Sequence, residues 1–71
     1  MKLMPEQTEK LLTGSQMFTN IAFSMMVTRM KSLYEKNPSQ TMLQTCTDEI
    51  NAFINKFSLI MIEDCKTIER I

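Results

Sequence analysis

The chain lacks several residue types on which catalytic sites commonly depend. Its 71 residues include no histidine, no tryptophan, one glycine, two prolines and two cysteines. Without histidine, the commonest general base and metal ligand is missing, and two distant cysteines do not make a zinc site. A lone glycine also excludes a glycine-rich phosphate loop. We therefore expect a protein that is not an enzyme and that uses no cofactor and no metal.

Neither sign of charge is in excess, since eight basic residues balance eight acidic ones. Nucleic-acid binding normally needs a basic surplus that displaces counterions from phosphates, so DNA and RNA are not expected partners. The acidic residues form no evident catalytic pair. For Asp64, near an apolar stripe, we expect a frayed or solvent-seeking carboxylate. A near-neutral surface repels other copies weakly, which favours association.

Long hydrophobic runs are also missing. The most hydrophobic stretches, I-A-F-S-M-M-V and F-S-L-I-M-I, are far shorter than the roughly 20 residues that span a bilayer. Near the start, Pro5 and acidic residues interrupt any signal-peptide core, so we expect a cytoplasmic protein. Cys46 and Cys65 would lie about 28 Å apart on one continuous helix, too far for a disulfide. We expect both to be structural thiols.

What the sequence does contain is helical periodicity around one clear turn, K-N-P-S-Q at residues 36–40. Asn37 is suited to a helix cap and Pro38 to the first position of the next helix. We predict an all-α domain over residues 1–71, an antiparallel two-helix hairpin. Helix 1 covers about 5–36 and helix 2 about 39–69, and a kink at Gly14 is left open.

The first arm has two apolar stripes, and one neighbouring helix can cover only one of them. The sequence leaves open which stripe faces inward. We assign one group to the hairpin core: Leu11, Phe18, Ile21, Ala22, Met25, Leu43, Cys46, Ile50, Phe53, Ile54, Phe57 and Met61. We assign the second group to a partner interface: Leu12, Phe23, Met26, Val27, Met30, Leu33, Tyr34, Leu59 and Ile62.

Three short motifs carry a resemblance: E-K-L-L-x-x-S near the start, K-S-L-Y-E-K-N-P before the turn and D-E-I-N-A-F-I-N after it. With them, the chain resembles the small E component of bacterial type III secretion systems. The resemblance covers most of the chain, but its motifs are leucines, charges and a turn proline. Thr41-Met42 departs from the Tyr-Gln that is common there, and helix 1 has fewer charges than the family.

The resemblance implies a cytoplasmic co-chaperone with the fold of a helical hairpin. Such a protein binds a helical-repeat chaperone and helps to keep the needle subunit, or a translocator protein, soluble until export. The needle subunit itself is the alternative, because L-x-E-K-N-P-S resembles its turn. Needle subunits, however, usually have a second proline there and a polar middle of helix 2, where this chain has F-S-L-I-M-I.

Three classes of function therefore follow from the sequence. The first is a chaperone or adaptor that covers the extra stripe with a different protein. The second is a structural subunit or homo-oligomer in which identical hairpins cover one another. The third, a small DNA-binding regulator, conflicts with the balanced charge.

Overall fold

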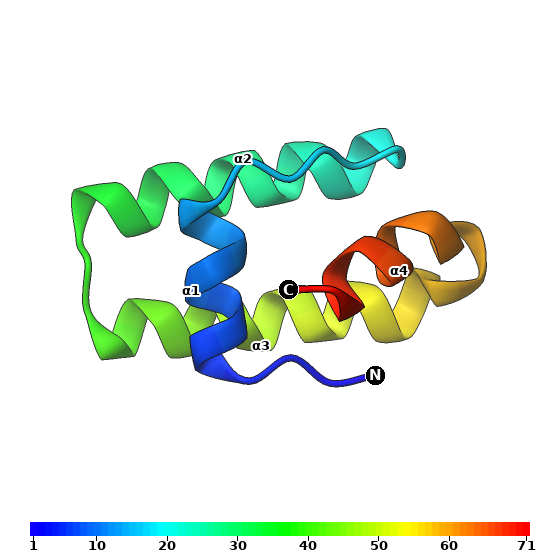
Figure 1. Ribbon diagram of the computed structural model, residues 1–71. Helices are drawn as coiled ribbons and strands as arrows, with labels where there is room; N and C mark the ends of the chain where they lie inside the picture. Colours follow the sequence, from blue (N-terminus) through cyan, green and yellow to red (C-terminus); the bar gives the residue numbers. More distant parts are fainter.

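Four α-helices, and not two, make up the structure, a computed structural model that describes residues 1–71 (Figure 1). They are α1 (Pro5–Thr13), α2 (Ile21–Lys36), α3 (Gln40–Phe57) and α4 (Ile62–Glu69), with a 3₁₀ turn η1 (Ser58–Ile60) between α3 and α4. The all-α prediction is confirmed. A hairpin with two unbroken arms would be about 45 Å long, whereas the longest dimension of the molecule is 31 Å. The two-helix prediction is therefore wrong outside the centre of the chain.

The centre of the chain does form the predicted antiparallel hairpin, from α2 through a short turn to α3. Lys36 is the last residue of α2, and Asn37 donates its backbone N–H to the carbonyl of Leu33 at 3.2 Å. Ser39, and not Asn37 as predicted, caps α3, because its hydroxyl accepts from the N–H of Met42 at 3.1 Å. Asn37 therefore ends the first helix of the hairpin and Ser39 begins the second.

The predicted helix 1 is broken between Thr13 and Ile21. Gly14 donates its N–H to the carbonyl of Lys10 and then leaves the helix in an extended conformation. The ammonium group of Lys31 on α2 donates to the carbonyl of Gly14 at 2.7 Å, which satisfies one of the open carbonyls at this helix end. Asn20 then starts α2 by accepting from the N–H of Phe23 at 3.0 Å.

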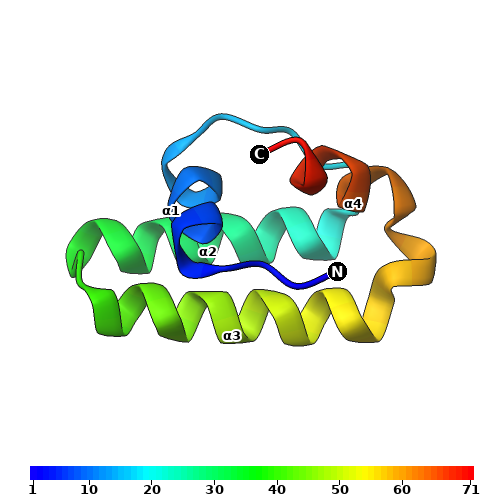
Figure 2. The same cartoon turned by 60° about the horizontal axis from the view of Figure 1, so that its bottom comes forward.

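Because the chain leaves the helix at Gly14, α1 lies across α2 and α3 instead of extending α2. Together with α4 and the linker, it forms a second layer on one side of the α2–α3 hairpin (Figure 2). Thr8 of α1 and Thr47 of α3 are both buried where the two helices meet, and the Thr47 hydroxyl donates to that of Thr8 at 2.7 Å. These side chains are small, so the two helices approach closely while both hydroxyls have partners.

The segment before α1 is also fixed on α3. The amide of Asn51 accepts from the backbone N–H of Leu3 at 2.8 Å and donates to the carbonyl of the same residue at 2.9 Å. The Leu3 side chain is buried in the core beneath this contact. The first residues of the chain are therefore part of the fold.

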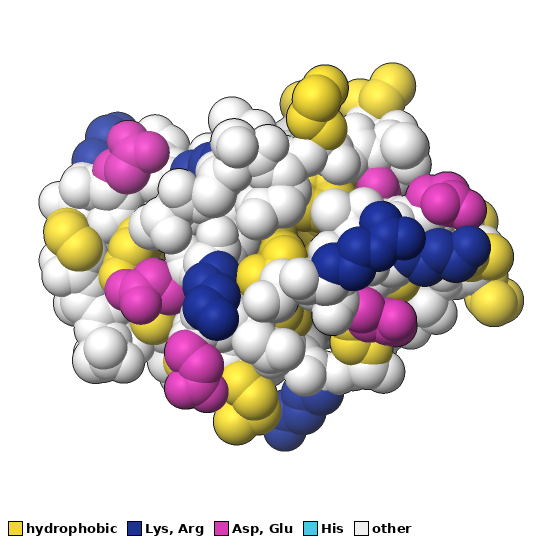
Figure 3. Space-filling view, in the orientation of Figure 1, with side chains coloured by type: hydrophobic (Ala, Val, Ile, Leu, Met, Phe, Trp, Pro, Cys, Tyr) yellow, Lys and Arg dark blue, Asp and Glu magenta, His cyan; other side chains and the backbone are white.

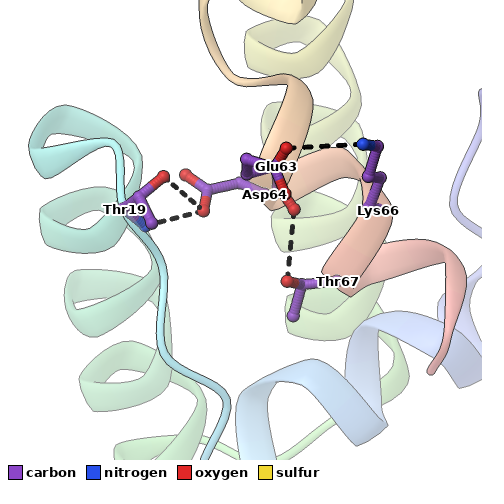
Figure 4. A network of polar contacts seen from close by, with 5 residues as sticks. All are labelled: Thr19, Glu63, Asp64, Lys66 and Thr67. Atoms are coloured by element: carbon purple, nitrogen blue, oxygen red, sulfur yellow. Dashed lines mark hydrogen bonds and ion pairs between the residues drawn. The ribbon is translucent and has the colours of Figure 1, made fainter.

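At the other end of the chain, α4 folds back toward the start of α2, and a single carboxylate joins the two. Asp64, only 1% exposed, accepts from the N–H of Thr19 at 2.6 Å and from its hydroxyl at 3.2 Å (Figure 4). It also accepts from the N–H of Asn20 at 2.8 Å. The expectation of a frayed or solvent-seeking Asp64 is therefore wrong. Its negative charge lies at the N-terminal end of α2, where the helix dipole favours an anion.

The core lies between the two layers and draws residues from all four helices. Four phenylalanines pack in sequence through it, with ring centroids 4.9 Å apart for Phe18–Phe23, 5.5 Å for Phe23–Phe53 and 4.7 Å for Phe53–Phe57. Phe23 is the fully buried member that joins the linker to α3. The central hairpin thus acquires its core by accepting side chains from both ends of the chain.

Replacing Gly14 with alanine tests whether the first helix is continuous or is broken at this residue, as observed. A Cβ atom at Gly14 would lie 2.8 Å from the Lys10 carbonyl oxygen and 2.6 Å from the side-chain nitrogen of Gln16. We expect the free energy of unfolding to fall by about 1–3 kcal/mol, the usual range for overpacking. In an unbroken helix the same change would raise it by about 1 kcal/mol. Urea denaturation followed by circular dichroism shows whether the free energy of unfolding falls or rises.

The contact between Tyr34 on α2 and Glu9 on α1 supplies a second test of the position of α1 across α2 and α3. The phenol donates to the Glu9 carboxylate at 2.8 Å, and this hydrogen bond, followed by desolvation and the charge of Glu9, raises the pKa of Tyr34. The contact therefore stabilises the folded state below the ordinary tyrosine titration range, and this contribution is lost as the pH rises through the raised pKa.

Because the chain has one tyrosine and no tryptophan, phenolate absorbance reports Tyr34 alone. We expect Glu9→Ala to lower its titration midpoint and Glu6→Ala, also on α1, to leave it unchanged. In a straight helix, Glu9 and Tyr34 would lie about 37 Å apart. Equal midpoints in the wild type and Glu9→Ala would therefore contradict the observed position of α1.

Removing the Asp64 carboxylate should destabilise the whole fold. Asp64→Ala leaves the backbone N–H groups of Thr19 and Asn20 without their acceptor, and we expect a loss of about 2–4 kcal/mol in the free energy of unfolding. Glu63→Ala is the matched control, because the adjacent Glu63 makes only an exposed 3.4 Å ion pair with Lys66 (Figure 4). Such pairs contribute about 0–1 kcal/mol. Equal losses in the two variants, measured by urea denaturation, would contradict the anchoring role of Asp64.

Candidate protein-interaction surface

The structure places most of the predicted interface of the first arm inside the molecule. The buried members are Leu12, Phe23, Met26, Val27 and Met30. They are covered because α1 and α4 lie on the face of the hairpin toward which this stripe of α2 points. In this structure these five residues form no exposed surface. The sequence identified a second stripe correctly, but the chain covers that stripe itself.

The remaining members of the predicted interface are more accessible. Tyr34 is half-buried, Leu33 is 40% exposed, and Leu59 and Ile62 are exposed at the turn between α3 and α4. Leu59 and Ile62 thus have the accessibility that an interface needs. Binding of a partner at these residues stays a prediction.

The predicted hairpin core is correct for α3 and wrong for the start of α2. Buried members are Leu11, Leu43, Cys46, Ile50, Ile54 and Met61, and Phe18, Phe53 and Phe57 are half-buried against them. Ile21, Ala22 and Met25 are exposed instead. The reason is that the inward face of α2 is the one beneath α1 and α4, which turns these three residues outward.

Exposed large apolar side chains gather at the end of the molecule where α2 begins and α3 turns into α4. We call this surface the apolar end; it contains Met17, Ile21, Met25, Leu59, Ile60 and Ile62. Its most open members are Met17 at 89% and Leu59 at 86% exposure. Hydrophobic atoms protrude from this end in the space-filling view (Figure 3).

The two parts of the apolar end are joined by the Asp64 contact. Asn20 immediately precedes Ile21, and Asp64 lies two residues after Ile62, so their 2.8 Å hydrogen bond brings the start of α2 beside the start of α4. Residues that are about 40 positions apart in the sequence thus lie at the same end of the molecule. Exposed apolar residues gathered in this way are typical of surfaces that contact other proteins.

Ile60 and Met17 are the members of this surface that were assigned neither to the predicted interface nor to the predicted core. Ile60 lies in the η1 turn, which breaks the periodicity of the predicted helix 2 and leaves this side chain 68% exposed. Met17 lies in the linker that the prediction treated as helix. The sequence pattern contained no direct sign of either change.

A groove of about 480 Å³ lies beside the apolar end, between the last turn of α3 and the whole length of α4, and Met1 also lines it. Its lining includes Ile54, Leu59, Ile62 and Cys65 together with the charged groups of Lys66 and Glu69. Desolvation, followed by the charges of Glu69 and Asp64, raises the pKa of the Cys65 thiol. The thiol is therefore kept in its less reactive, protonated form, and the groove holds no activated nucleophile.

The other cysteine is equally inert. Cys46 is buried in the core, and desolvation with the charge of Glu49 raises the pKa of its thiol. Both cysteines are free, as predicted. They belong to the packing of α3 and α4.

Other kinds of site have less support in the geometry. No three His, Cys, Asp or Glu side chains come together where they could hold a metal ion. None of the helices combines the length and apolar character that crossing a membrane requires. Comparison of the chain with models of protein families, with curated proteins and with solved structures finds no match.

Proposed function

We propose that the protein is a non-enzymatic interaction module that binds the apolar face of a helix or helical groove of another protein through α2. The observation that carries this proposal is the exposure of Ile21 (76%) and Met25 (68%). They lie four positions apart in α2, so both side chains project from the same face of the helix. Apolar anchors at this spacing are the usual means by which a helix docks into an apolar groove.

The surroundings of this pair support binding of another protein rather than of a charged ligand. Ala22, next to Ile21 in α2, is also exposed, and its small side chain allows a partner to approach the α2 backbone. The exposed side chain of Met25 is unbranched and polarisable, so it can adapt to a partner surface. The net charge of zero offers no general attraction for polyanions.

The resemblance to the small E component of type III secretion systems supplies a specific partner for this proposal. The partner would be a cytoplasmic helical-repeat chaperone, and the cargo a needle or translocator subunit. The four-helix arrangement differs from the hairpin that the resemblance implies. For this reason the exposed face of α2 carries the general proposal, and the resemblance carries only the choice of partner.

Two pairs of substitutions, one on α2 and one on α3, test the proposal. Ile21→Asp/Met25→Asp places two charges in the apolar face and should weaken binding on the order of 100-fold, as expected for the loss of interface anchors. Thr41→Asp/Thr45→Asp adds the same charges at the same spacing on exposed positions of α3, near the turn of the hairpin and away from Ile21 and Met25, and is the matched control. Both pairs should change the free energy of unfolding by no more than about 0.5 kcal/mol per site, because all four side chains are exposed.

The measurement is co-expression of the tagged chain with the helical-repeat chaperone and needle-type subunit of a type III secretion system from the same organism. A defined heteromer that the control retains and Ile21→Asp/Met25→Asp loses would support both the binding face and the partner. If no heteromer forms, the choice of partner is wrong. The binding face is wrong if a partner obtained by another route binds Ile21→Asp/Met25→Asp as tightly as the wild type.

A further inference from the structure

The turn between α3 and α4 has no residue that would break a helix. Ser58, Leu59, Ile60 and Met61 separate the two helices, and no glycine or proline occurs anywhere after Pro38. The backbone departs from helical geometry at Phe57 (φ −120°, ψ 17°) and at Met61 (φ −128°, ψ 41°), whereas Ser58 between them is helical (φ −55°, ψ −34°). Local sequence therefore favours one helix through this segment, and tertiary contacts impose the turn.

The contacts that impose the turn are made between α4 and the rest of the molecule. Met61 and Ile68 are each 1% exposed in the core, and Asp64 is bound to Thr19 and Asn20. The packing of α4 against the end of α3 is less complete, since the groove of about 480 Å³ separates them. α4 is therefore held mainly by its contacts with the linker and the core, and less by its contacts with α3.

We propose that a second copy of this chain provides the same site, so that the protein forms a domain-swapped dimer. In this dimer, α3, residues 58–61 and α4 join into one helix, and α4 occupies the partner copy's site. Asp64 accepts from the same Thr19 and Asn20 groups, now of the other copy, and Met61 and Ile68 enter the same core. Domain swapping keeps the contacts of the exchanged element and changes only the conformation of the hinge, which here is residues 58–61.

Two features of the hinge favour the exchange. First, in a continuous helix the N–H of Met61 gains an i→i−4 hydrogen bond in place of the long 3.4 Å bond that it now donates to the carbonyl of Ser58. Second, Leu59 and Ile60, which are 86% and 68% exposed, lie in the hinge of both copies, where the two long helices meet. The balanced charge of the chain opposes this approach only weakly. The swap does not depend on the proposed binding of another protein.

Paired alanine and glycine substitutions at the hinge distinguish a domain-swapped dimer from a dimer held by its exposed apolar side chains. Leu59→Ala/Ile60→Ala and Leu59→Gly/Ile60→Gly both remove the exposed side chains. Glycine, however, disfavours a helix by about 1 kcal/mol per residue relative to alanine, and a swapped dimer has two such hinges. We expect the alanine variant to dimerise at least on the order of 100-fold more tightly than the glycine variant. Surface association would be weakened to a similar extent in both.

The measurement is sedimentation equilibrium over a concentration series that reaches the millimolar range, with circular dichroism as the check that each variant is folded. If the double glycine variant loses helicity, Ile60→Ala and Ile60→Gly provide the same comparison. Wild-type and alanine chains that stay monomeric throughout, or equal dimerisation of the alanine and glycine variants, would overturn the proposal.

Exchange kinetics and an α2 variant complete the test. An isolated dimer should return to monomer slowly on dilution, because α4 must leave the core before it can refold onto its own chain. Immediate dissociation on dilution would contradict the swap. Ile21→Asp/Met25→Asp should dimerise like the wild type, so failure of the swap and failure of the proposed α2 binding face are distinguishable.

Discussion

The carboxylate of Asp64 is the contact on which the arrangement of the four helices depends. A buried charge is tolerated only where hydrogen bonds replace its hydration, and the N–H groups of Thr19 and Asn20 with the Thr19 hydroxyl provide three of them. The same bonds satisfy donors at the start of α2 that have no partner within that helix. One side chain thus caps α2 and holds α4 against it. Together with the burial of Met61 and Ile68, this contact keeps α4 folded back against a local sequence that favours a continuous helix.

Polar contacts also determine the position of α1, although the surrounding core is apolar. Hydrophobic burial stabilises many orientations of a short helix, whereas hydrogen bonds with fixed geometry favour one of them. Asn51 holds the backbone of Leu3 through two bonds, and the hydroxyls of Thr8 and Thr47 meet 2.7 Å apart. These contacts lie at two places along α3 and so fix both the position and the direction of the first helix.

The parts of this fold that the sequence could predict are those governed by local signals. Lys36, Asn37 and Pro38 mark the turn, and the period of the apolar residues identifies α2 and α3. The fold-back of α4 could not be predicted in this way, because residues 58–61 favour a helix and the deciding partners, Asp64 and Thr19, lie 45 positions apart. The surface was misassigned for the same reason. Two stripes on α2 were evident, but only the position of α1 and α4 decides that Phe23 faces inward and Ile21 outward.

The folded chain therefore covers only part of the apolar side chains that the sequence provides, and the rest are exposed to the surroundings. Both ends of the chain fold onto one side of the α2–α3 hairpin and cover the stripe that contains Phe23 and Met30. They cannot also cover Ile21 and Met25, which face away from that layer, or Leu59, which the hinge turns outward. A chain of this length buries only about 60% of the surface of its unfolded state, so association adds burial that the monomer cannot reach. The face of α2 and the hinge are the two places where the structure leaves that burial to be gained, the first through the proposed binding of another protein and the second through the proposed exchange with a second copy.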